Sequence, residues 1–170
     1  MLWARHAAVN PSHMMRIVPG QLDDPRVVAL LQTHVTTARA QTAPGSAHAL
    51  DLSGLKAPGI RFWTVWDGQA LLGTGALKWL SADHGEVKSM HTAEAARRRG
   101  AGSMMLRHII DRARADGLRR LSLETGSWDF FRPAQAFYRA HGFVECGPFG
   151  DYVLDPNSVF MTLELGALAG

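Results

Sequence analysis

The stretch from Ala93 to Leu106, "AEAARRRGAGSMML", places three arginines before Gly-Ala-Gly and then becomes apolar. The apolar positions continue at helical spacing through Ile109, Ile110 and Ala113, with charged residues opposite, which predicts an amphipathic helix. The run "EVKSMHT" (86–92) before it and the run "LRRLSLET" (118–125) after it have the composition of strands. A helix between two strands of one sheet makes those strands parallel neighbours. The stretch therefore predicts a β-α-β crossover at the centre of an α/β fold.

The rest of the chain supplies further strands and helices around this crossover. Asp24 and Pro25 are typical of a helix start, and Asp67-Gly68 is typical of a tight hairpin turn. We expect a mixed α/β sheet. The other expected elements are strands near 16–18, at 60–66, 70–80 and 158–165, and helices beginning at 25, around 47–52 and at 133–141.

Length and composition bound the organisation. A chain of 170 residues fits one compact domain, which we place at residues 15–166. Residues 1–14 show no periodicity and precede a second methionine, so we expect an upstream start or a cloning remnant outside the fold. The single cysteine, Cys146, excludes an internal disulfide framework and offers no metal cluster. We expect a cytoplasmic protein, without a membrane partner because no apolar run is long enough for a span.

The charge pattern is dominated by arginine. The net charge is +3, and of the 18 Lys and Arg residues all but Lys56, Lys78 and Lys88 are arginine. Arginine suits phosphate and carboxylate contacts. Because a small net charge over a whole domain is a weak signal for nucleic acid, we expect no nucleic-acid partner. A basic nucleic-acid binder using 97–99 remains the less favoured alternative.

Gly100 and Gly102 stand between the expected strand and the first turn of the expected helix. The first turn of a helix has unpaired N–H groups and a partial positive charge, and glycine lets a phosphate approach both. The turn around Gly100 and Gly102, which we call the anion cradle, is therefore expected to bind phosphate. The spacing is neither that of a P-loop nor that of a Rossmann fingerprint, whose third glycine is here Met105. The alternative is a tight turn with solvated arginines.

Two motifs together resemble a known family. Arg97-x-x-Gly100-x-Gly102 matches the Gln/Arg-x-x-Gly-x-Gly/Ala signature of the GNAT acetyltransferase superfamily. The segment "AQAFYRAHGF" (134–143) is similar to that superfamily's second motif, where a Tyr precedes Gly-Phe. The resemblance runs from about Arg16 to Leu165 and extends to a group of small bacterial acetyltransferases. It implies a GNAT-like mixed sheet, mostly antiparallel, flanked by helices.

The resemblance also implies ligands and the residues that bind them. Acetyl-CoA would be the co-substrate, no metal would be needed, and the acceptor would be an amine of a small molecule or peptide. A homodimer is expected by family analogy only. The pantetheine arm would pair with Met90, His91 and Thr92. The resemblance extends the anion cradle to residues 97–103, so that the pyrophosphate would bind at Arg97, Arg98, Arg99, Gly100, Ala101, Gly102 and Ser103.

Acetyl transfer to an amine requires a group that removes a proton. An alkyl ammonium with a pKa near 10.4 is neutral in only about one molecule in a few thousand at pH 7, so a general base is useful. Glu86 is the first candidate, because it lies fourteen residues before Gly100, an offset at which some family members place their base. The alternative is that Glu86 forms an ion pair with Lys88 on the same strand face. Glu124, at the end of the next strand, is the reserve candidate.

The leaving thiolate needs a proton, and Tyr138 matches the family's tyrosine for this role. The alternative is that Tyr138 is an aromatic residue of the hydrophobic core. For the acceptor, acidic residues would favour a cationic amine and aromatic residues a flat one. The sequence does not choose between these two kinds of acceptor. It also leaves open the alternative function of a non-catalytic acyl-CoA-binding module. Candidate lining residues are His48, Asp51, Trp63, Trp79, Phe130, Phe131 and 151–157.

Overall fold

The computed structural model describes residues 14–166. The extension expected at 1–14 therefore lies outside the described residues, apart from Met14. In chain order the elements are β1 (Met15–Pro19), α1 (Pro25–Ala40), α2 (Leu52–Leu55), β2 (Ile60–Asp67), β3 (Ala70–Trp79), β4 (His84–Thr92), η2 (Glu94–Ala96), α3 (Ala101–Ala115), β5 (Arg120–Gly126), η3 (Asp129–Phe131), α4 (Arg132–Ala140), β6 (Val144–Cys146) and β7 (Ser158–Glu164).

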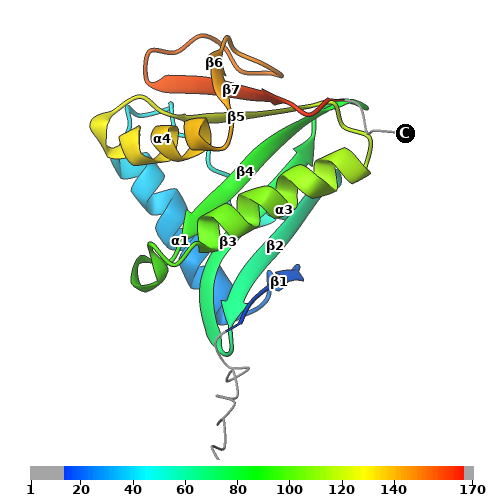
Figure 1. The fold of residues 1–170 in the computed structure, drawn as a ribbon. Coiled ribbons are helices and arrows are strands. Elements are labelled where there is room, and N and C mark those ends of the chain that lie inside the picture. The colour runs from blue at the N-terminus through cyan, green and yellow to red at the C-terminus, as the bar shows by residue number, and fades with distance from the viewer. Residues whose placement is uncertain (1–13, 167–170) are drawn as a thin grey trace, which may run out of the picture.

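The strands form one seven-stranded sheet in the order β1-β2-β3-β4-β5-β7-β6 (Figure 1). All neighbouring pairs are antiparallel except β4 and β5, which are parallel and are connected through α3. The expected mixed, mostly antiparallel sheet with a β-α-β crossover at its centre is confirmed.

Helices cover both faces of the sheet. On one face, Val27 and Leu31 of α1 pack with Phe62 of β2. On the other, α3 and α4 pack against a core that contains the next residue of β2, Trp63. This alternation follows from the period of two in a strand, which sends successive side chains to opposite faces. The two helical layers therefore cover opposite faces of the sheet at β2–β4, and the core under α3 extends to β5.

Close packing at Gly75 fixes α3 on the sheet. A Cβ atom at Gly75 would lie 2.5 Å from Cγ of Met105, so the helix rests directly on the glycine backbone of β3. Any larger residue at this position would push α3 away. The N-terminus of α3 is therefore held beside the end of β4, which is the local geometry that the anion cradle needs.

The two parallel strands at the centre of the sheet pair over a short length only. Residues 84–86 of β4 pair with 120–122 of β5, and beyond this the two strands are no longer partners. Further along β4, the pairing with β3 shifts register between Thr74 and Ala76, and Ser89 has a φ of 54°. Such a bulge bends a strand and increases its twist. The strands separate beyond Glu86 and Ser122.

Three local expectations need correction. The short helix expected around 47–52 begins only at Leu52, because Asp51 caps it by accepting a hydrogen bond from the Gly54 N–H. Residues 126–132, for which no helix or strand was expected, contain the helical turn η3. The strand β6 was not expected at all, because three residues are too short to show a period.

Candidate active site

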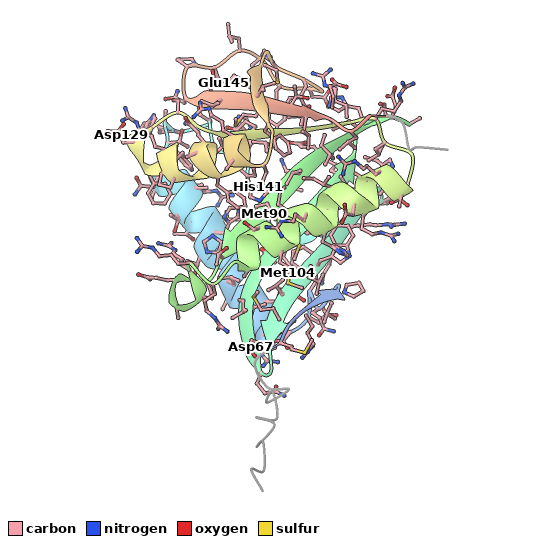
Figure 2. All side chains as sticks on the ribbon, in the orientation of Figure 1. Asp67, Met90, Met104, Asp129, His141 and Glu145 are labelled. Carbon is pink, nitrogen blue, oxygen red and sulfur yellow. The ribbon has the colours of Figure 1, made fainter. Side chains whose placement is uncertain are left out.

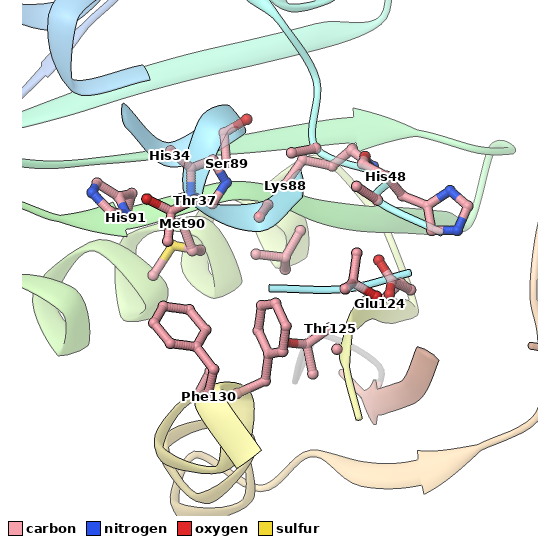
Figure 3. A pocket seen from close by; sticks show the side chains of 18 of the residues that line it. His34, Thr37, His48, Lys88, Ser89, Met90, His91, Glu124, Thr125 and Phe130 are labelled. Atoms are coloured by element: carbon pink, nitrogen blue, oxygen red, sulfur yellow. The ribbon is translucent and has the colours of Figure 1, made fainter. Parts of the chain in front are cut away.

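A cavity of about 390 Å³ opens where β4 and β5 separate (Figure 3). Residues 87–91 of β4 form one wall, and residues 124–126 of β5 with Phe130 and Phe131 form another. Helix α1 and the loop after it close the remaining side. Helix α1 and the loop after it contribute Thr33, His34, Thr37, Ala38, Thr42, Ser46, Ala47, His48 and Ala49 to the lining. The remaining lining residues come from 94–97 and from α4, and they are Glu94, Arg97, Ala134 and Tyr138.

The anion cradle has the geometry that phosphate binding requires. Gly100 is the N-cap of α3 with a φ of 84°, and no atom lies within 4 Å of where its Cβ would be. A Cβ at Gly102 would face Thr92 Oγ1 at 3.4 Å and the Phe137 ring at 3.6 Å. The N–H groups of the first helical turn have no acceptor within the helix. These residues fit a pyrophosphate that approaches the backbone closely.

The three arginines before Gly100 differ in their surroundings. Arg97 lines the cavity. Arg98 adopts a φ of 66°, and the Arg99 guanidinium lies 2.5 Å from a carboxylate oxygen of Asp67. Asp67 is at the end of β2, at the hairpin tip marked in Figure 2, away from the cavity lining. Met90 and His91 line the cavity as well. Arg97 is thus the arginine of the three that is placed to reach a ligand there.

Glu86 is buried in an ion pair. Its side chain is 3% exposed, and Oε2 lies 3.2 Å from Nζ of Lys88, whose side chain is 8% exposed. The Tyr152 hydroxyl donates a hydrogen bond to the same oxygen at 2.5 Å. The Lys88 ammonium also donates to the Tyr152 hydroxyl at 2.9 Å and to the main-chain oxygen of His48 at 3.2 Å. Glu86 is not among the residues that line the cavity.

Glu124 is the carboxyl group of β5 that lines the cavity. Burial raises its pKa to about 7 from an ordinary 4.5, and the negative charge of Glu86 acts in the same direction, while the positive charge of Lys88 opposes it. Figure 3 shows Glu124 on the β5 side of the cavity and Lys88 on the β4 side. A carboxyl group with this pKa can accept a proton near neutral pH and release it again.

This pKa predicts a pH-dependent stability. Between pH 4.5 and 7 the folded protein keeps a proton on Glu124 that the unfolded chain releases, so this group lowers the free energy of unfolding as pH rises through that range. Glu124→Gln removes the titration. We expect the variant to exceed wild type in urea-unfolding free energy by on the order of 3 kcal/mol at pH 8. Near pH 5 the difference should be far smaller. An equal difference at both pH values would contradict the raised pKa.

Tyr138 of α4 also lines the cavity. Its ring packs edge-on against Phe137 and Phe143, so it serves the core as well. Burial raises the pKa of its phenol, which keeps the hydroxyl protonated at neutral pH. Tyr138 therefore has the protonation state that a proton donor needs.

Two histidines of the lining carry no positive charge at neutral pH. Burial is the main cause that lowers the pKa of His34 to about 4, and the neighbouring His91 and Lys88, which disfavour a second positive charge, act in the same direction. Burial and the charge of Arg97 lower the pKa of His91. The two rings lie side by side, with centroids 5.0 Å apart. They join α1 to β4 as neutral imidazoles.

Of the expected acceptor-lining residues, only His48, Phe130 and Phe131 line the cavity. Asp51 caps α2, and Trp63 is buried in the core. Trp79 packs at that core's edge, and Asp155 accepts hydrogen bonds from Asn157. Sequence reasoning missed His34, Thr42 and Ser46, together with the contact that Tyr152 makes through its hydroxyl. None of these residues belongs to a local motif, so no signal in the sequence could have indicated them.

Two features are absent from the part of the chain that the structure describes. Residues 14–166 contain no helix with the length and apolarity that a membrane crossing requires. Within the same range, no three His, Cys, Asp or Glu side chains group together as metal ligands would.

Comparison with known proteins gives matches over most of the chain. Residues 28–143 match the acetyltransferase (GNAT) family. The chain is 47% identical over 152 residues to YedL, an uncharacterized N-acetyltransferase of Escherichia coli (strain K12), covering 89% of this chain and 96% of that protein. It is 46% identical over 151 residues to YsnE, an uncharacterized N-acetyltransferase of Bacillus subtilis (strain 168), covering 89% of this chain and all of that protein.

The fold is shared with solved structures. One is a GNAT family acetyltransferase from Elizabethkingia anophelis with acetyl-CoA bound, which aligns with a TM-score of 0.64 at 16% identity. The alignment covers 88% of this chain and 97% of that one.

Proposed function

Since this chain belongs to the acetyltransferase (GNAT) family, we propose that it transfers the acetyl group of acetyl-CoA directly to a primary amine of a small molecule or peptide. Donor and acceptor would be bound together. The observation that carries the proposal is that Arg97 of the anion cradle and the raised-pKa carboxyl of Glu124 line one cavity. Binding of an anionic donor and acceptance of a proton from an amine can then occur in one place.

We assign the general base to Glu124 in preference to Glu86. Glu86 already accepts hydrogen bonds from Lys88 and Tyr152 and lies outside the cavity lining. Glu124 lines the cavity and has a pKa of about 7. This combination favours it as the group that takes the acceptor's proton.

The donor, when bound, supplies an acetyl thioester, and the residues of the chain manage the protons. Glu124 takes one proton from the acceptor ammonium, and the nitrogen lone pair attacks the acetyl carbonyl carbon. As the C–N bond forms, the C–S bond breaks, and the sulfur leaves with the bonding electrons and takes a proton from Tyr138. The nitrogen loses two protons overall. The first passes through Glu124 to solvent, and the second restores the Tyr138 hydroxyl.

The cradle and the end of β4 would hold the donor. The pyrophosphate fits the backbone N–H groups at Gly100 to Ser103, with Arg97 adding charge. Met90, His91 and Thr92 lie at the end of β4, where the pantetheine arm can extend along the strand. Arg99 is assigned no role in phosphate binding, because Asp67 already pairs with it.

The test is an assay of thiol release from acetyl-CoA with a panel of primary amines, combined with acetyl-CoA-dependent thermal stabilisation. We expect the melting temperature to rise and free thiol to appear together with an equal amount of acetylated amine. Stabilisation without thiol release from any amine would instead identify a non-catalytic acyl-CoA-binding module. In that case Tyr138→Phe would change neither the stabilisation by acetyl-CoA nor the absence of thiol release.

A further inference from the structure

We propose that the acceptor is a primary amine that carries no anionic group, and that the buried cluster of Glu86, Lys88 and Tyr152 excludes carboxylated acceptors. This rests on the proposed acetyl transfer and narrows its substrate class. The acceptor's ammonium group would face Glu124, and the rest of the acceptor would lie against apolar and hydroxyl-bearing walls. Amines joined to a carboxylate, such as free amino acids, would be poor substrates.

The first step concerns Lys88, the one lysine that lines the cavity. An ammonium group has three N–H donors. All three have acceptors within the protein, namely Glu86 Oε2 at 3.2 Å, the Tyr152 hydroxyl at 2.9 Å and the His48 main-chain oxygen at 3.2 Å. No donor is left for a substrate carboxylate. The positive charge of Lys88 is also balanced by the carboxylate of Glu86. Both side chains are buried, with 8% of Lys88 and 3% of Glu86 exposed.

The second step concerns the other basic groups of the lining. Arg97 belongs to the anion cradle, where the donor's phosphates would engage it. His34 and His91 have lowered pKa values and are neutral. The ring of His48 packs edge-on against Tyr152, with centroids 5.0 Å apart. Apart from the His48 ring, a carboxylate at the acceptor end of the described cavity would therefore meet no free cation.

The third step concerns what an acceptor carboxylate would meet instead. Glu124 stands in that part of the cavity and becomes negative when it is ready to accept a proton. A second carboxylate close by would be repelled and would raise the pKa of Glu124 further. The remaining lining contributes methyl groups, aromatic rings and hydroxyls, from Thr37, Thr42, Ala47, Phe130 and Phe131. Burying an unpaired anion in such surroundings is strongly unfavourable.

The experiment compares acceptors that differ in charge but little in shape. Benzylamine, 4-(aminomethyl)benzamide and 4-(aminomethyl)benzoate share one body, and phenylalaninamide and phenylalanine form a second pair. Thiol release is measured at pH 8, above the ordinary pKa of imidazole. We expect kcat/KM for each amide to exceed that of its carboxylate by about tenfold or more. Carboxylates accepted as well as their amides would overturn the inference while leaving acetyl transfer intact.

A charge variant tests whether the cluster is responsible. Glu86→Gln preserves size and an acceptor for Lys88 but removes the neutralising charge. The preference for amide over carboxylate should then narrow severalfold, because Lys88 leaves a net positive charge beside the cavity. Glu164→Gln, which changes an exposed side chain at the end of β7, is the matched control and should leave the ratio unchanged. An unchanged ratio in Glu86→Gln would refute the role of the cluster. Absence of thiol release with every amine would refute the proposed function itself.

Discussion

Replacing Glu124 by glutamine is expected to lower kcat/KM for acetyl transfer by roughly 100- to 10,000-fold, the usual contribution of a positioned general base. The amide matches the carboxyl group in size and cannot take the acceptor's proton. Burial is the main reason why the pKa of Glu124 is raised to about 7, and an uncharged amide in its place avoids the cost of burying a charge. The variant should fold and should still be stabilised by acetyl-CoA. Steady-state thiol release with one good amine measures the loss.

Two glutamate variants make this result specific. Glu164→Gln changes an exposed carboxylate on β7 and should leave kcat/KM within about twofold of wild type. Glu86→Gln changes the carboxylate that Lys88 and Tyr152 hold, and we expect a smaller loss than in Glu124→Gln. A large loss of kcat/KM in Glu86→Gln, with near-normal kcat/KM in Glu124→Gln, would identify Glu86 as the general base.

Introducing leucine at Gly102 is expected to abolish stabilisation by acetyl-CoA. Gly102 lies in the first turn of α3, and a Cβ there makes only ordinary contacts with Thr92 and Phe137, so the backbone accepts a side chain. The longer leucine side chain would occupy the space in which the pyrophosphate approaches the N–H groups. In wild type, acetyl-CoA at 100 times its Kd should add about 2.7 kcal/mol to the free energy of unfolding. Thermal unfolding with and without acetyl-CoA measures this difference.

Two further glycine substitutions separate binding from folding. Gly147→Leu lies in an exposed segment where no atom is within 4 Å of the added Cβ, and it should retain the full stabilisation. Gly102→Ala should bind more weakly than wild type while being slightly more stable without ligand, because alanine favours a helix over glycine by about 1 kcal/mol. Full stabilisation of Gly102→Leu by acetyl-CoA would show that the cradle is elsewhere.

The fold was predictable where the sequence has a clear period. The apolar face of α3, with Met105 and Ile109, and the strands on either side of it gave the parallel pair at the centre. The hairpin at Asp67-Gly68 followed from turn chemistry. Strand β6 could not be predicted, because three residues carry no period and pairing with β7 alone defines them as a strand.

The site was predictable only where it depends on a local motif. Gly100 and Gly102 were indicated by their place between strand and helix, and the structure places them at the start of α3, while their binding of phosphate stays a prediction. The choice between Glu86 and Glu124 was not predictable. It depends on Tyr152, which lies 66 residues from Glu86 in the chain and donates a hydrogen bond to its carboxylate. It depends also on the separation of β4 from β5, which leaves Glu124 facing the cavity.

The pH dependence of kcat/KM for the wild-type protein with an alkyl amine tests the central claim most directly. If Glu124 must be ionised to take a proton from the ammonium form, log kcat/KM rises with a slope of one, levels off near pH 7, and falls again only above the amine's own pKa near 10. A profile that keeps rising with a slope of one from pH 6 to the amine's pKa would mean that the free amine reacts without the help of a base. That result would contradict the assignment of Glu124 as the general base.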